Sequence, residues 1–252
     1  MTAPLALVTG GASGIGLAFA QRWTREGGRI ALLDLDQDAI DRTVDMLGGD
    51  DRAMGSAIDV RDDDAVRAAV AASASRNDGV LDAVVNCAGI ARPARAADAT
   101  DEEWTRLVDV HLNGTMRVNR AAHRYLQASH QASIVNISSV AAVSGMPGRS
   151  SYCAAKAGVE GLTKALAVEW APDHIRVNAV APGYVNSQMI GGLIASGQLG
   201  LEPVIARTPM RRLAEPHELS SAIYFLSSSE ASYITGHTLY VDGGMTIDGN
   251  WY

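Results

Sequence analysis

Short runs of aliphatic and β-branched residues alternate with longer helical patterns along the whole chain of 252 residues. We expect strands over residues 5–9, 29–34, 54–59, 81–86, 133–138, 175–181 and 238–241. We expect helices over residues 15–26, 37–47, 62–76, 101–127, 151–170 and 216–227. Strands that are separated by helices pair in parallel, and the helices cover both faces of the sheet. The pattern therefore predicts one α/β domain, residues 1–252, built on a doubly wound, seven-stranded parallel sheet.

The first expected strand runs directly into the sequence TGGASGIG, residues 9–16, and the first helix begins within it. Gly10, Gly14 and Gly16 lack a Cβ, so the backbone can turn tightly and approach a pyrophosphate closely. The phosphates then lie against the unpaired N–H groups at the start of the helix. A glycine-rich loop between the first strand and the first helix predicts a dinucleotide-binding site.

The second expected strand ends at Asp34, eighteen residues after Gly16. A carboxylate at this point can accept hydrogen bonds from the adenosine ribose of NAD, and it repels the 2′-phosphate of NADP. No compensating cation stands at the neighbouring positions, which are Ala12, Ser13, Leu35 and Asp36. These features predict NAD as the cofactor. In the alternative, Asp34 only caps the turn or the helix that follows.

Tyr152 and Lys156 are four residues apart within an expected helix. That spacing places both side chains on one face of the helix, one turn apart. A neighbouring ammonium favours the phenolate, so we expect Lys156 to lower the pKa of Tyr152 from its usual value of about 10. The two residues form a candidate acid/base pair, although a Tyr and a Lys at this spacing also occur by chance in many helices.

The composition argues against several other classes of protein. The net charge is −7 and no cluster of basic residues exceeds the pair at 211 and 212, so a nucleic-acid partner is not expected. No apolar stretch approaches the ~18 residues of a membrane helix, and the amino-terminal sequence has no basic signal-peptide region. Cys87 and Cys153 lack metal-ligand spacing and the histidines are scattered, which predicts a cytoplasmic protein with reduced thiols and no metal.

Residues 183–215 interrupt the alternation of strands and helices. The segment follows the sixth expected strand, and it contains Gly191, Gly192, Gly197, Gly200, Pro203 and Pro209 among apolar residues. A long segment with glycine hinges at the carboxyl end of a strand predicts a lid over a substrate site. The alternative is a short helical excursion that packs on the surface of the domain.

Seven motifs follow one another along the chain: TGGASGIG at residues 9–16, DV at 59–60, NCAG at 86–89, NISS at 136–139, YCAAK at 152–156, PG at 182–183 and VDGG at 241–244. In order and spacing this series resembles the short-chain dehydrogenase/reductase family across essentially the whole chain. The resemblance implies a single Rossmann-type domain with the strand order 3-2-1-4-5-6-7. It also implies hydride transfer between a nicotinamide and an alcohol or carbonyl group.

The resemblance also implies roles for individual residues. Ser139 polarises the substrate oxygen, Tyr152 exchanges its proton, and Lys156 holds the nicotinamide ribose and lowers the pKa of the tyrosine. The implied cofactor site consists of Gly10, Ser13, Gly14, Ile15, Gly16, Asp34, Asp59, Val60, Asn86, Ala88, Gly89, Tyr152, Lys156, Pro182, Gly183, Val185 and Ser187. These roles agree with the chemistry, since hydride loss from an alcohol needs a base beside a group that binds the hydroxyl.

Two positions depart from the family pattern. Cys87 replaces the second asparagine of the usual NNAG motif, and we interpret it as a small buried side chain. His111 stands where the family has the asparagine that completes a catalytic tetrad, and Asn113 is two residues too late to replace it. A neutral imidazole also has one donor and one acceptor, so we expect a neutral His111 whose protonation contributes to loss of activity in acid. In the alternative, His111 only braces the helix and the relay runs through a backbone carbonyl.

The sequence favours an NAD-dependent oxidoreductase that acts on a secondary alcohol, a polyol or the corresponding ketone. The alternatives are a 3-oxoacyl-carrier-protein reductase, a non-catalytic dinucleotide-binding regulator and an extended epimerase or dehydratase. Three arginines, Arg149, Arg207 and Arg211, either contact an anionic substrate or lie in solvent. The resemblance also implies a homotetramer that pairs through the fourth and fifth helices and through the last strands, where the two terminal aromatic residues are available for a contact.

Overall fold

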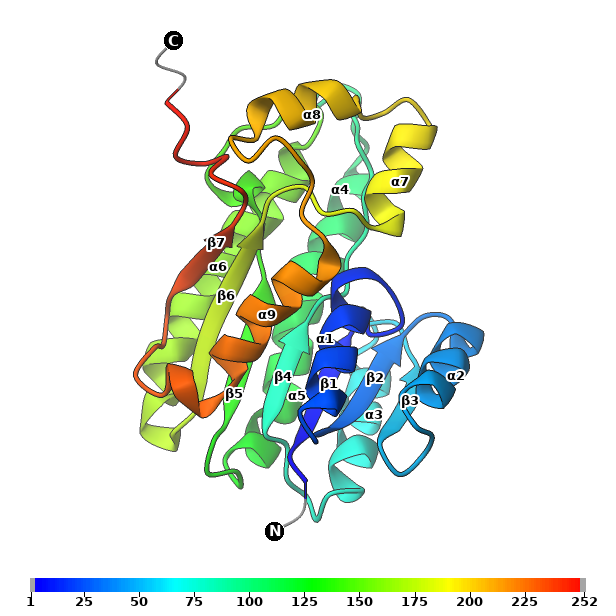
Figure 1. The fold of residues 1–252 in the computed structure, drawn as a ribbon, viewed down its shortest axis with the longest axis vertical. Coiled ribbons are helices and arrows are strands. Elements are labelled where there is room, and N and C mark those ends of the chain that lie inside the picture. Colours follow the sequence, from blue (N-terminus) through cyan, green and yellow to red (C-terminus); the bar gives the residue numbers. More distant parts are fainter. Residues whose placement is uncertain (1–2, 250–252) are drawn as a thin grey trace.

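The computed structural model describes residues 3–249, and their strands form one parallel sheet with the order β3-β2-β1-β4-β5-β6-β7 (Figure 1). The strands are β1 Leu5–Thr9, β2 Arg29–Asp34, β3 Ala53–Ala57, β4 Ala83–Asn86, β5 Ser133–Ile137, β6 Arg176–Pro182 and β7 Thr238–Val241. The α-helices are α1 Gly14–Arg25, α2 Gln37–Met46, α3 Asp63–Ser75, α4 Asp101–Val108, α5 Gly114–Leu126, α6 Ser150–Trp170, α7 Gln188–Ala195, α8 Leu201–Arg207 and α9 Pro216–Ser227. The expected strand order is confirmed, and strand ends differ from the expected ones by up to about two residues.

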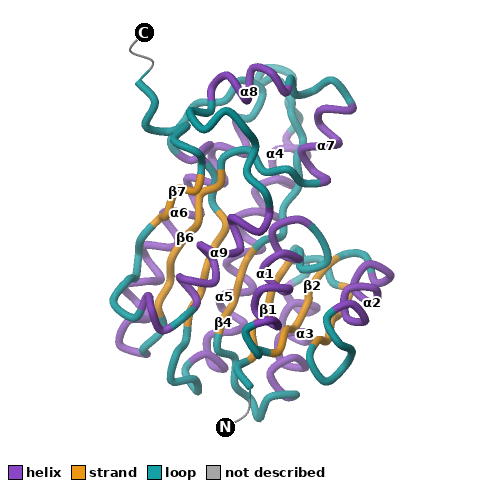
Figure 2. The backbone as a smooth tube through the Cα atoms, viewed as in Figure 1, coloured by secondary structure: helices purple, strands orange, loops and turns teal. Residues whose placement is uncertain are grey.

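Helices cover both faces of the sheet because both faces of its central strands are apolar. In β1, Leu5 and Leu7 contribute to a core under α3, α5 and α6, whereas Ala6 and Val8 contribute to a core under α1 and α9. Successive residues of a strand point to opposite faces, so one short apolar run serves two layers. Figure 2 shows α1 and α9 in front of the strands, with α3 and α5 behind them. The doubly wound arrangement places every strand's carboxyl end at the same edge of the sheet.

One expected helix, over residues 101–127, is wrong as a single α-helix. Its place is taken by α4, a π-helical segment Asp109–Asn113, and α5. At the end of the π-helical segment, the Thr115 hydroxyl donates a hydrogen bond to the backbone carbonyl of His111 at 2.8 Å. A local widening of this kind does not alter the apolar periodicity enough for the sequence pattern to reveal it.

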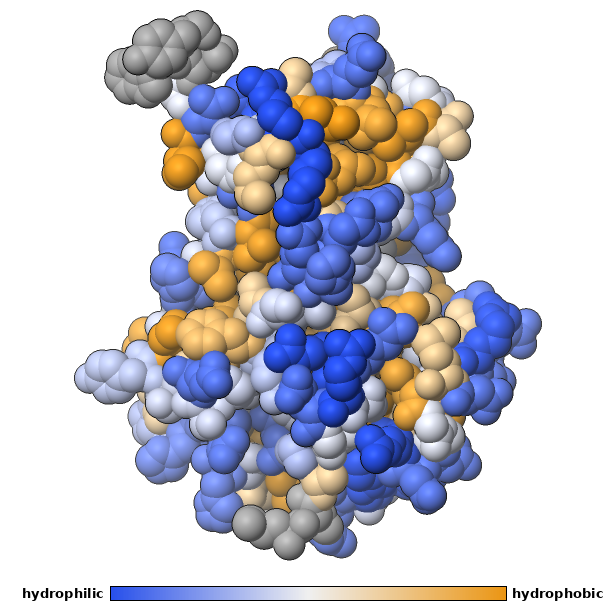
Figure 3. Space-filling model, viewed as in Figure 1, coloured by the Kyte–Doolittle hydropathy of each residue, from blue (hydrophilic) through white to orange (hydrophobic). Residues whose placement is uncertain are grey.

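The segment over residues 183–215 contains two short helices, α7 and α8, above the carboxyl edge of the sheet (Figure 1). Apolar side chains gather over these helices on the surface (Figure 3), and they include the partly exposed Met189 and Leu201. The terminal aromatics at residues 251–252 lie outside the described residues. Within residues 3–249, no helix has the length and apolar character to span a bilayer, and no acidic, His and Cys side chains cluster as metal ligands would.

Candidate active site

A large pocket opens at the carboxyl ends of β1, β2 and β4, where the chain order of the sheet reverses. This crossover is where doubly wound folds bind ligands. The pocket has about 1080 Å³ of free space, including its open mouth. Eleven of the expected cofactor residues line it: Gly10, Ser13, Gly14, Ile15, Gly16, Asp34, Asp59, Val60, Ala88, Gly89 and Ser187. The glycine-rich loop, Asp34, the DV pair and part of the NCAG motif are therefore brought together in one cavity.

The glycine-rich loop has the close approaches that a pyrophosphate cradle requires. Gly10 has φ +64°, and a Cβ on it would lie 3.0 Å from the backbone nitrogen of Ala88. A Cβ on Gly16 would lie 2.2 Å from the carbonyl oxygen of Gly10, so the first turn of α1 packs against the loop only with glycine there. The N–H groups of that first turn have no partners within the helix. These residues fit the pyrophosphate of a dinucleotide.

Asp34 lies at the end of β2 with its carboxylate fixed by the backbone. One oxygen accepts a hydrogen bond from the Ala12 nitrogen at 3.0 Å, and the other accepts from the Leu35 nitrogen at 2.8 Å. Two cations that no sequence motif indicated, Arg61 and Arg106, line the same pocket. They come from the loop after β3 and from α4, so no neighbouring sequence position reveals them.

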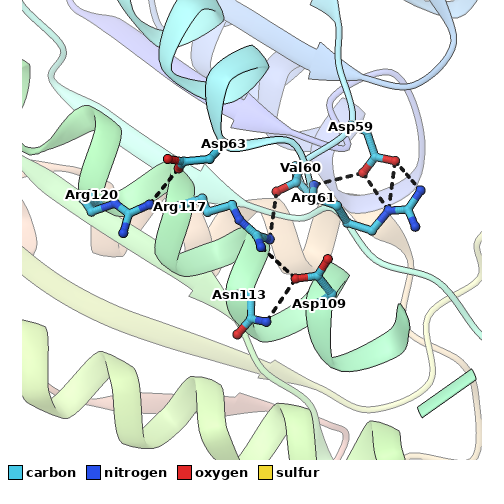
Figure 4. A network of polar contacts seen from close by, with 8 residues as sticks. All are labelled: Asp59, Val60, Arg61, Asp63, Asp109, Asn113, Arg117 and Arg120. Atoms are coloured by element: carbon cyan, nitrogen blue, oxygen red, sulfur yellow. Dashed lines mark hydrogen bonds and ion pairs between the residues drawn. The ribbon is translucent and has the colours of Figure 1, made fainter. Parts of the chain in front are cut away.

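Arg61 is already engaged by a carboxylate of the same wall. Its guanidinium lies 2.6 Å from Asp59, and hydrogen bonding to Arg61 lowers the pKa of that carboxyl (Figure 4). Figure 4 also shows Arg117 between Asp109 and the backbone carbonyl of Val60, with the Arg117–Asp109 contact at 2.9 Å. This network joins the loop after β3 to the π-helical segment and α5, and so it fixes the shape of this end of the pocket.

Ser139, Tyr152 and Lys156 come together where β5 ends and α6 begins. Ser139 follows β5 and caps a short 3₁₀ turn, where its hydroxyl oxygen accepts a hydrogen bond from the Ala141 nitrogen at 3.1 Å. Tyr152 is in the first turn of α6, and Lys156 follows one turn later. The lysine Nζ lies 5.7 Å from the centre of the Tyr152 ring. Helical spacing thus places Lys156 beside Tyr152, and Ser139 lines the same cavity as the tyrosine from the end of β5.

Lys156 is buried, and its Nζ donates a hydrogen bond to the Ile137 carbonyl at 2.6 Å. Burial lowers the pKa of Lys156 to about 8, so the side chain remains largely an ammonium at neutral pH. The pKa of Tyr152 is raised, because loss of solvent around the phenol outweighs the opposing effects of Ser139 and Arg149. The expectation that Tyr152 has a lowered pKa is therefore wrong for the protein alone, where burial dominates.

His111 lies in the π-helical segment with only 3% of its surface exposed. Its Nε2 lies 2.9 Å from the Ile90 carbonyl oxygen and 3.1 Å from the Ile90 nitrogen, whereas Nδ1 has no partner among the described residues. The ring meets that of Tyr152 edge-on, with 5.3 Å between centroids. A Cβ on Gly89 would lie 2.6 Å from the His111 ring, so this glycine makes room for the imidazole.

The imidazole of His111 is neutral over the range in which proteins usually work. Burial, assisted by the charge of Lys156, lowers the pKa of His111 to about 3. The expected neutral ring agrees with this value. Protonation of His111, which we expect to contribute to loss of activity in acid, therefore requires a pH near 3. Asn113 is exposed and donates to Asp109 at 3.0 Å, so it does not take the place of His111.

Several expected cofactor residues do not line the large pocket. Asn86 is the clearest difference: its side-chain amide is buried and donates to Asn119 at 2.6 Å and to Asn136 at 2.9 Å. Its side chain therefore joins β4 to α5 and β5. Pro182 ends β6, and Val185 packs into the apolar core under α9. Neither side chain lines the pocket.

A second, smaller cavity adjoins the first and has about 450 Å³ of free space, including its open mouth. Ser139 and Tyr152 line it together with Gly183, and Met189 of α7 lines both cavities. Its other walls are largely apolar. A small molecule in this cavity would have its polar group beside the serine and the tyrosine, next to the pocket that fits a dinucleotide. Fold and site together define a dinucleotide-dependent oxidoreductase of the α/β class.

Comparison with known proteins identifies the family. A family described as enoyl-(acyl carrier protein) reductase matches residues 10–246. The chain is 40% identical over 243 residues to the cis-4-hydroxycyclohexanecarboxylate dehydrogenase of Sinomonas cyclohexanicum, which covers 96% of both chains. It is 36% identical to a 3-oxoacyl-(acyl-carrier-protein) reductase of Thermotoga maritima, over 96% of this chain and 97% of that one.

Solved structures agree with this result. A short-chain type dehydrogenase/reductase from Mycobacterium ulcerans superposes with a TM-score of 0.90 at 30% identity, over 97% of this chain and 90% of that one. The aldohexose dehydrogenase of Thermoplasma acidophilum gives 0.88 at 32% identity, over 99% of this chain and 96% of that one. The protein belongs to the short-chain dehydrogenase/reductase family, whose members bind a nicotinamide dinucleotide, and it is an oxidoreductase.

Proposed function

We propose that the protein transfers a hydride between NAD(H) and a secondary alcohol, a polyol or the corresponding ketone. One observation carries the proposal: Ser139 and Tyr152 line a small cavity beside the dinucleotide pocket, with the Lys156 ammonium one helical turn away. The substrate oxygen lies between the serine hydroxyl and the phenol. Residues 183–215 act as a lid over this cavity, because Met189 of α7 lines both cavities.

The protein's own groups move the proton in this reaction. Ser139 donates a hydrogen bond to the substrate oxygen and holds it beside the phenol. Tyr152 gives its proton to a ketone oxygen during reduction and removes the hydroxyl proton during oxidation. Lys156 contributes positive charge, which stabilises the phenolate in the oxidation direction. When bound, the nicotinamide supplies the hydride chemistry, and its oxidised ring adds a second positive charge.

The choice of NAD rests on Asp34, which lines the dinucleotide pocket and carries a negative charge where NADP has a phosphate. Arg61 and Arg106 on the same wall favour the opposite choice and support a second candidate, an NADPH-dependent 3-oxoacyl-carrier-protein reductase. The relative from Thermotoga maritima bears that activity in its name. We favour NAD because Arg61 is neutralised by its ion pair with Asp59.

The experiment follows nicotinamide absorbance at 340 nm over a panel of polyols, hydroxysteroids, hydroxy acids and aryl alcohols. It includes acetoacetyl-coenzyme A with NADPH to test the second candidate. Tyr152→Phe should reduce turnover to background while NADH binding, measured by fluorescence, stays within about twofold, since only the exchangeable proton is lost. Tyr233→Phe removes a fully exposed phenol and serves as the matched control. Full turnover in Tyr152→Phe would require another acid/base and would overturn the assignment.

A further inference from the structure

Arg149 is the one charged side chain among the described residues that line the smaller cavity. It directly precedes the first residue of α6 and stands three residues before Tyr152. Around it the cavity wall is apolar, with Val140, Met146 and Leu193 among its members. Arg149 therefore shares this cavity with Ser139 and Tyr152, and its charge acts on the phenol of Tyr152.

The Arg149 side chain has no hydrogen-bond or ion-pair partner within residues 3–249. Most other arginines near the site are committed to protein groups: Arg61 pairs with Asp59, Arg117 with Asp109, and Arg212 with Glu218. A partly enclosed cation without a partner loses hydration that only an anion restores well. The vacant donors of Arg149 thus distinguish it from these neighbours.

The structure also distinguishes Arg149 from Arg207 and Arg211, the two other arginines whose contacts the sequence did not decide. Arg207 is exposed on α8 and does not line the cavity. Arg211 donates to the Ala206 carbonyl at 2.7 Å and does not line the cavity either. The charge of Arg149, by contrast, acts on the phenol of Tyr152, which lines the same cavity. Only Arg149 of the three can contact a molecule that is held beside the phenol.

We propose that Arg149 binds a carboxylate on the substrate, so that the physiological substrate is a small hydroxy acid or oxo acid. The inference rests on the proposed function, because it assumes that the reacting oxygen lies at Ser139 and Tyr152. The planar guanidinium matches a carboxylate in a two-point contact, which also fixes orientation. The free space of about 450 Å³ accommodates a compact skeleton between the two polar ends. The apolar walls favour a hydrocarbon skeleton over a polyhydroxylated one.

The test compares two ketones of the same skeleton, 4-oxocyclohexanecarboxylate and its uncharged carboxamide, with NADH as the reductant. The unmodified protein should prefer the acid in kcat/KM by at least about tenfold, and Arg149→Met should abolish that preference, because it lowers kcat/KM for the acid at least about tenfold more than for the amide. Arg149→Lys should recover part of the preference, since it restores the charge without the planar fork. Arg42→Met removes an exposed arginine of α2 that lines neither cavity; it is the matched control and should behave as the unmodified protein does.

A binding measurement separates this inference from the proposed function. Calorimetric titration with cyclohexanecarboxylate, which has no reactive carbonyl, should show binding to the protein with NADH and a loss of at least about tenfold in Arg149→Met. If the protein reduces the amide and Arg149→Met does not selectively lower kcat/KM for the acid, the inference is overturned and the proposed function stands. Equal losses for acid and amide also overturn it, because Arg149 would then act through Tyr152. Arginine-dependent binding without any turnover overturns the proposed function and supports the anion site.

Discussion

Asp34→Asn should weaken the discrimination between NAD and NADP while leaving the dinucleotide pocket formed. The side-chain oxygens of Asp34 accept hydrogen bonds from the backbone nitrogens of Ala12 and Leu35. Asparagine keeps the size of the side chain and one of these acceptors, so the glycine-rich loop remains anchored at one of the two points. The substitution therefore removes mainly the negative charge, which is the quantity under test.

The magnitude follows from the charges on the pocket wall. A carboxylate and a 2′-phosphate dianion about 5 Å apart repel each other by about 1.7 kcal/mol at the dielectric constant of water, and by several times more at an effective value of ~20. Arg61 does not offset this repulsion, since it lies 2.6 Å from Asp59. Arg106 carries one further positive charge, which reduces the net value. The unmodified protein should therefore prefer NAD by at least about tenfold in kcat/KM.

The assay measures kcat/KM for both cofactors with one alcohol, and Kd for NADH and NADPH by fluorescence. Asp34→Asn should narrow the NAD preference by about tenfold. Asp38→Asn removes an exposed acidic side chain from the first turn of α2, outside the pocket lining, and is the matched control. Equal efficiency with both cofactors in the unmodified protein, or an unchanged ratio in Asp34→Asn, would show that Asp34 does not face the ribose.

The remaining predictions concern protonation and assembly. Lys156, with a pKa of about 8, carries its charge below that pH and loses it above, so kcat/KM should fall on the alkaline side of about pH 8. Lys156→Arg should lack this fall in the activity that it retains. If the variant and the unmodified protein show the same alkaline fall, Lys156 is not its source. His111, with a pKa of about 3, is neutral across mild acid, so His111→Asn and the unmodified protein should have coincident acid limbs between pH 5 and 7. A shift of that limb would mean that His111 titrates there. We also predict a homotetramer in light scattering, and a monomer at micromolar concentration would contradict this prediction. Val168 lies on α6, the fifth expected helix, and is 79% exposed in the single chain, so Val168→Glu should place a charge in the expected interface and dissociate the tetramer.

The fold was predictable because its determinants are local and repeated. Each central strand is a short apolar run, and in β1 alternate residues such as Leu7 and Val8 enter opposite cores, so even five residues indicate a strand covered on both sides. Gly10 and Gly16 mark the nucleotide loop because only glycine tolerates the observed approaches to Ala88 and to the loop carbonyl. The spacing of Tyr152 and Lys156 likewise follows directly from helical geometry.

The parts that sequence did not predict depend on contacts between distant elements. Arg61 reaches the dinucleotide pocket from the loop after β3 and Arg106 reaches it from α4, so inspection of the residues beside Asp34 could not find them. The direction in which the pKa of Tyr152 shifts depends on its burial, and the four-residue spacing from Lys156 gives no information about burial. Asn86 stands in a motif that suggests cofactor contact, yet its amide turns to two other asparagines in the core.

The contacts of His111 favour a bracing role for this residue over a role in proton relay. Its Nε2 lies within hydrogen-bond distance of both the carbonyl and the N–H of Ile90, and one ring nitrogen satisfies only one of them in a given tautomer. An asparagine side chain has a separate donor and acceptor, so it could bond to both the carbonyl and the N–H of Ile90. Histidine keeps the contact with Ile90 but makes one hydrogen bond fewer. The Lys156 ammonium contacts the Ile137 carbonyl and not the imidazole. We therefore propose that His111 supports the wall formed with Gly89 and Tyr152 and takes no part in a proton path behind the lysine.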